Sequence, residues 1–111
     1  MDSDKIQPVL LEELSRLRAE GRRDQLVDVI VSVAGTRDGR LRDAAALEAD
    51  ARASQAPLRA RLDAMGVRGY TPLTLANAVE VKLTPDQVLE IATEPSVVAV
   101  VWNRLERVTT A

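Results

Sequence analysis

The sequence contains no cysteine, no histidine and no phenylalanine among its 111 residues. Without cysteine the chain can form neither disulfides nor thiolate metal sites, and without histidine it lacks the commonest general base and the commonest metal ligand. Its acidic residues do not have the spacing of a calcium-binding loop, and the glycine-bounded segment 35–39 lacks the lysine of a phosphate-binding loop. We therefore predict a protein that is not an enzyme and that holds no metal and no cofactor.

A strong charge of either sign is also missing. The 15 basic and 17 acidic residues give a net charge of -2, which argues against nucleic acid or an anionic membrane as a partner. The opening segment has acidic residues where a signal peptide is positively charged, and its longest apolar run, residues 9–11, is too short for export or membrane insertion. We therefore expect a cytoplasmic protein.

The residues that are present predict one domain with an aliphatic core. The length suits a single core, and Tyr70 and Trp102 are the only aromatic residues. Near the N-terminus, leucines at steps of three and four residues predict an amphipathic helix over residues 7–20. Segment 26–33 then alternates between valines and a second set that includes Leu26 and Ile30, which predicts a first strand.

The middle of the chain is richer in alanine and is interrupted by prolines. Residues 41–65 predict a helical stretch. Pro57 lies inside it, removes one backbone hydrogen bond and crowds the preceding turn, so we predict that it kinks or splits the helix, and we favour a split near Ser54. Segment 67–75 predicts an irregular edge strand, because Pro72 interrupts it, and this strand should form a hairpin with the next one.

The last third contains a strand, a capped helix and a second strand in succession. Residues 78–83 show the two-residue alternation of a half-buried strand. Thr84 and Gln87 have the spacing of a reciprocal N-terminal cap. Pro95 ends the helix, and the β-branched run at 97–101 predicts the final strand.

These elements predict an α+β fold in the order β-α-β-β-α-β. This is the ferredoxin-like split βαβ arrangement, in which an antiparallel four-stranded sheet buries one face under two helices. The predicted units are an N-terminal helical extension (1–21), the ferredoxin-like domain (22–103) and a C-terminal tail (104–111).

The strings LANAVEVKLT and EPSVVAV, on either side of the short helix, resemble the inhibitor domain found as the propeptide of subtilisin-like serine proteases and as small free-standing inhibitors of them. The matching positions are packing and turn residues: Asn77, Val79, Leu83, Pro95, Val97 and Val100. Such residues indicate a fold better than an activity. A propeptide of a secreted protease normally follows a signal peptide, so the chain would be either an excised propeptide or an intracellular, free-standing inhibitor.

The resemblance implies that the chain inhibits a subtilisin-like serine protease or assists its folding. The open sheet face would dock on the protease, and the tail would extend through the active-site cleft, with Val108, Thr109, Thr110 and Ala111 in successive pockets. The sequence also allows a simpler alternative, in which residues 104–108 continue the last strand and the remaining residues fray.

The sheet face opposite the two helices is the other candidate site. Leu26, Ile30 and Trp102 would supply apolar side chains there, although a lone tryptophan at the edge of a small core often serves packing alone. Either the N-terminal helix or a partner protein could cover this face. The second functional hypothesis follows: an adaptor or homo-oligomerisation module on the same scaffold, with the N-terminal helix as its handle and no protease inhibition.

Overall fold

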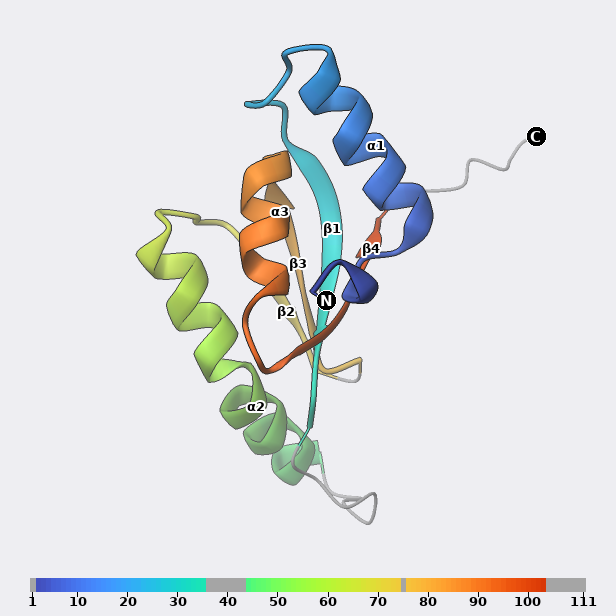
Figure 1. The fold of residues 1–111 in the computed structure, drawn as a ribbon. Coiled ribbons are helices and arrows are strands. Elements are labelled where there is room, and N and C mark those ends of the chain that lie inside the picture. The colour runs from blue at the N-terminus through green and yellow to red at the C-terminus, as the bar shows by residue number, and fades with distance from the viewer. Residues whose placement is uncertain (1, 36–43, 75, 104–111) are drawn as a thin grey trace, which may run out of the picture.

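The computed structural model describes residues 2–35, 44–74 and 76–103 (Figure 1). Its elements, in chain order, are the 3₁₀ helix η1 (Asp2–Lys5), α1 (Pro8–Ala19), β1 (Val27–Val33), α2 (Ala44–Ala64), β2 (Thr71–Leu73), β3 (Ala78–Leu83), α3 (Pro85–Ala92) and β4 (Val97–Trp102).

The strands form one antiparallel sheet in the order β2-β3-β1-β4. Strand β3 therefore separates β1 from β2, the two strands that α2 connects. In the same way, β1 separates β3 from β4, which α3 connects. Both β-α-β units are thus split by a strand of the other unit. The predicted α+β class, the antiparallel four-stranded sheet and the hairpin of β2 with β3 are confirmed.

The core lies between one face of this sheet and the helices. In register, Val29 lies opposite Val81, and Val31 lies between Val79 and Val100. All five valines are at most 3% exposed. The helices contribute the buried side chains Leu10, Leu14, Leu17, Leu58, Leu62, Val88 and Ile91 to the same cluster. Full burial of one such side chain is worth about 1.5–3 kcal/mol relative to exposure, so this layer supplies most of the fold's stability.

Helix α1 belongs to the same layer as α2 and α3. Helix α3 contacts both of the others, and Figure 1 shows it between them. The leucines of α1 join the single core cluster, so this helix does not cover the second face of the sheet. On its solvent side, Arg16 donates hydrogen bonds to Glu13 and Glu20, at 2.6 and 3.0 Å. These bonds raise the pKa of Arg16 above its ordinary value.

The predicted split of the middle helix is wrong. Helix α2 runs continuously through Pro57 (Figure 1). Proline removes only the hydrogen bond to the carbonyl four residues earlier, which here belongs to Ala53. Because Ala53 and Pro57 are both exposed, water can satisfy that carbonyl, while Leu58 and Leu62 are fully buried on the opposite side. Burial of the leucines therefore outweighs the local cost of the proline.

The predicted cap of α3 is confirmed. The Thr84 hydroxyl accepts a hydrogen bond from the Gln87 backbone N–H at 3.3 Å, and the Gln87 side chain accepts one from the Thr84 backbone N–H at 2.9 Å. Two N–H groups that a helix start would leave unpaired are thereby satisfied.

Asn77 has a structural role in the turn before β3. Its φ of +49° lies in the left-handed region, which asparagine tolerates better than most residues. The side chain is buried, where its amide donates to the Val33 carbonyl at 3.4 Å and its oxygen accepts from Gln55 at 3.3 Å. Asn77 therefore connects the hairpin turn to both β1 and α2.

Candidate functional site

The second face of the sheet, called the outer face below, consists of the strand side chains that alternate with the core residues. Its members include Asp28, Ile30, Ser32, Glu80, Lys82, Ala99 and Val101. These side chains are half-buried or exposed, whereas the alternate residues of β1 are buried. In the described part of the chain, every helix packs on the opposite face (Figure 1). Among the described residues, no helix covers the outer face.

Apolar side chains follow the β1–β4 pair along the outer face. Ile30 lies directly opposite Val101, and both are half-buried. Leu26, just before β1, is 54% exposed. A sheet face turned to water normally carries polar side chains at such positions. We call Leu26, Ile30 and Val101 the apolar row.

Trp102 does not lie on the same face of the sheet as Leu26 and Ile30, with which the sequence analysis grouped it. Leu26 and Ile30 are in the apolar row, but Trp102 lies opposite Val29, which points into the core. Paired residues of an antiparallel sheet project to the same side, so Trp102 belongs to the helix-covered face. There it packs against the edge of the core. The interpretation as packing therefore fits Trp102 better than an outer-face anchor.

One end of the outer face carries a polar cluster that the sequence did not reveal. Asn103, the residue after β4, donates a side-chain hydrogen bond to Glu80 at 2.7 Å and a longer one to Asp28 at 3.5 Å. Its backbone N–H donates to the Asp28 carbonyl at 2.9 Å. A lone asparagine after a strand has no distinctive sequence signal, and only the strand pairing brings these three residues together. We call them the Asn103 clamp.

A shallow groove of about 400 Å³ lies at the same end of the sheet. Its lining side chains include Leu26 from the apolar row, the carboxylates of Asp28 and Glu80, and the cations Arg68 and Lys82. Opposite charges beside an apolar row suit a protein surface better than a small apolar ligand.

Both edges of the sheet are obstructed within the described residues. At the β4 edge, Ile6 forms a parallel bridge with Val100, and the Gln7 backbone N–H donates to the Val100 carbonyl at 2.9 Å. The Gln7 side chain also accepts from the Trp102 backbone N–H at 2.9 Å. At the other edge, β2 is only three residues long and contains Pro72, which has no N–H to donate. A partner is therefore more readily accommodated on the outer face than as an added strand.

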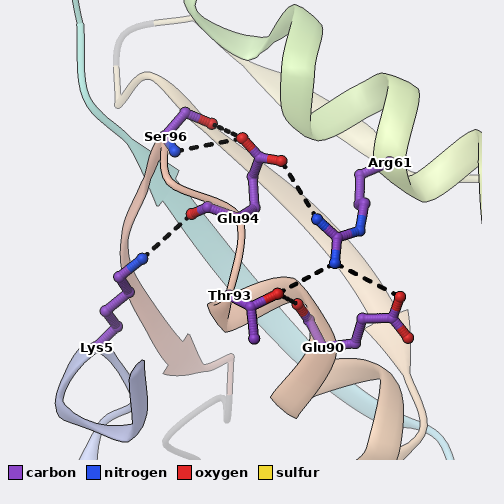
Figure 2. Close-up of polar contacts among 6 residues, drawn as sticks. All are labelled: Lys5, Arg61, Glu90, Thr93, Glu94 and Ser96. Atoms are coloured by element: carbon purple, nitrogen blue, oxygen red, sulfur yellow. Dashed lines mark hydrogen bonds and ion pairs between the residues drawn. The ribbon is translucent and has the colours of Figure 1, made fainter. Parts of the chain in front are cut away.

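A second polar cluster lies on the helix side, around Arg61 (Figure 2). Arg61 contacts Thr93 at 3.1 Å, Glu94 at 3.5 Å and Glu90 at 3.6 Å. Glu94 also accepts from the backbone and side chain of Ser96, at 3.3 and 3.0 Å. The Thr93 hydroxyl donates to the Glu90 carbonyl at 2.6 Å, so its proton is already committed. These contacts tie α2 to the end of α3 and indicate a structural role.

Other kinds of site find little support. Residues 2–35, 44–74 and 76–103 contain no group of three or more acidic residues that could hold a metal ion. Within the same residues, no helix is both long and apolar enough to cross a membrane. The four tail residues 108–111, assigned above to a protease cleft, lie outside the described residues. Comparison with known proteins gives no matching family model, curated protein or solved structure.

Proposed function

We propose that this chain is a protein-binding domain of the subtilisin-propeptide type, which inhibits a subtilisin-like serine protease or assists its folding. The observation that carries the proposal is the outer face, which has an apolar row and no covering helix among the described residues. The sequence resemblance supplies the identity of the partner.

In docking, the outer face would supply most of the buried interface area, and the tail would supply the specificity. The apolar row supplies apolar surface whose burial favours association. Residues 104–111 follow β4 directly and contain neither proline nor glycine. They can therefore lie extended in a protease groove, held by main-chain hydrogen bonds. Residues 108–111 would occupy successive pockets.

The mechanism would be occupancy of the cleft and not chemistry. A peptide held in a groove by main-chain hydrogen bonds and by a docked sheet dissociates slowly, and affinity differences of this kind reside mostly in the dissociation rate. Slow dissociation keeps the substrate out even if the tail resembles a cleaved substrate.

The test is a titration of the chain against a panel of subtilisin-like proteases, with hydrolysis of a peptide substrate as the readout. We expect the full chain to inhibit at least one of them, and a chain lacking residues 104–111 to lose inhibition while keeping the unfolding temperature of the full chain. Equal inhibition by both forms would contradict the role of the tail. No inhibition by the full chain would contradict the proposed function.

One observation favours a second candidate, self-association through the outer face. Asp28 and Lys82 lie opposite each other there, beside the apolar row. A twofold axis could bring each charge against the opposite charge of a second copy. Helix α1 is a poor binding surface for this alternative adaptor, because its side chains Leu10, Leu14 and Leu17 are buried within the chain. A dimeric mass in sedimentation equilibrium, together with no protease inhibition, would favour this candidate.

A further inference from the structure

The free edge of β4 is covered by the two residues that precede α1. Ile6 forms a parallel bridge with Val100, and the Gln7 backbone N–H donates to the Val100 carbonyl at 2.9 Å. The Gln7 side-chain oxygen accepts from the Trp102 backbone N–H, also at 2.9 Å. One residue therefore satisfies two backbone groups that β4 turns away from β1. We call Ile6 and Gln7 the edge guard.

The edge guard is anchored at both of its ends. Ile6 is 3% exposed and belongs to the core cluster. Before it, the Lys5 ammonium donates to the Glu94 carbonyl at 3.2 Å (Figure 2), and after it Pro8 begins α1. A covering segment that is tethered in this way has a high effective concentration at the edge. It therefore competes strongly with a strand from any other chain.

Strand β4 has little other protection as an edge. Residues 97–102 contain no charged residue, no proline and no glycine, and four of the six are valines. Short apolar segments of high β-propensity and low charge are the ones that pair between chains. Exposed edges usually carry a proline or a charge, or are very short, as β2 is with its three residues and Pro72. The register shift of β4 lies at its start and leaves Ala99 to Trp102 in regular pairing with β1.

The strand that matches this edge is β4 of a second copy. In an antiparallel pair about a twofold axis beside Val100, each Val100 lies opposite the other, and the two residues exchange their N–H and C=O groups. This pairing uses the edge that the edge guard now occupies. We infer that the edge guard prevents β4 from pairing with β4 of a second copy, so that weakening it produces an edge-to-edge dimer. The inference does not depend on the proposed function, and its test uses no protease.

The experiment measures association of the full chain by sedimentation equilibrium in a series of Gln7 variants. Gln7→Pro removes both hydrogen bonds and places the ring against the Val100 carbonyl, while the φ of -54° at this position already suits proline. Gln7→Ala removes only the bond to Trp102, and Gln7→Glu keeps a side-chain acceptor for it. Each variant is also made in an Ile30→Thr background, which weakens any dimer formed through the outer face. Thr84→Ala is the control for lost stability, because it acts through the cap of α3.

We expect Gln7→Pro to raise the association constant at least about tenfold above wild type, and Gln7→Ala to raise it about threefold. Gln7→Glu and Thr84→Ala should remain within about twofold of wild type. The increases should be the same in the Ile30→Thr background. Unfolding temperatures are measured for every variant, and if Gln7→Pro does not fold, Gln7→Ala decides the test.

Three results would overturn the inference. The first is an association constant that stays at the wild-type value in the folded variants that lose hydrogen bonds of Gln7. The second is an equal increase in Thr84→Ala, because lost stability would then explain the association. The third is disappearance of the increase in the Ile30→Thr background, which would place the new dimer on the outer face instead of the β4 edge.

Discussion

The two faces of the sheet differ sharply although they share the same strands. Val29 and Val31 are fully buried beneath the helices, whereas Ile30 between them is half-buried on the outer face. The helix-covered face needs aliphatic side chains because its burial stabilises the fold. The outer face has no such requirement from the described residues, yet it keeps an apolar row. If the outer face binds a partner, stability and recognition lie on opposite sides of one strand, and substitutions can separate them.

The strongest test of the helix-covered face concerns helix α1, which the sequence placed outside the core domain. Leu14 is 1% exposed and belongs to the core cluster. We expect Leu14→Ala to lower the free energy of unfolding by about 2–5 kcal/mol, because it leaves a cavity in a packed interior. Urea unfolding followed by circular dichroism measures the change. The half-buried Leu11 on the same helix serves as the control, and Leu11→Ala should cost clearly less. Equal, small losses would mean that α1 is not part of the cooperative unit.

A second test asks how α2 brings its leucines to the helix-covered face. If the helix is continuous, Pro57→Ala restores a hydrogen bond and relieves crowding, and this gain exceeds the stiffness that proline gives the unfolded chain. We expect a net stabilisation of about 1–2 kcal/mol by urea unfolding. Pro95→Ala makes the same chemical change outside any helix and should not stabilise the protein. A neutral or destabilising effect of Pro57→Ala would instead favour two helices with Pro57 in the first turn of the second.

Local patterns predicted the elements well where one short segment contained the whole signal. The alternation of β1 and the reciprocal cap of Thr84 and Gln87 are both confirmed. The middle helix was interpreted wrongly, because the cost of Pro57 is local whereas the burial of Leu58 and Leu62 depends on the sheet. Rules that consider only neighbouring residues could not compare the cost of Pro57 with the stabilisation from burying the two leucines.

The candidate site depended still more on long-range pairing. Residues 97–101 of β4 are apolar in both alternating sets, so the sequence could not assign Trp102 to a face, and only its partner Val29 does so. Asn103 gave no signal because its acceptors lie 75 and 23 residues away along the chain. Leu26 and Ile30 were predicted correctly as outer-face residues, since the buried valines between them fixed the alternation of β1.

The smallest expected effect on stability belongs to the outer face, and a matched pair of substitutions tests it. Val101 is half-buried on the outer face, opposite Ile30, and Val9 is 39% exposed on α1. Replacing either with threonine keeps the β-branched shape and removes apolar surface, so each should change the free energy of unfolding by no more than about 1 kcal/mol. If the outer face binds a partner, Val101→Thr should weaken protease inhibition, or the dimer of the alternative, whereas Val9→Thr should change neither. Equal behaviour of the two variants in both assays would place recognition elsewhere on the chain.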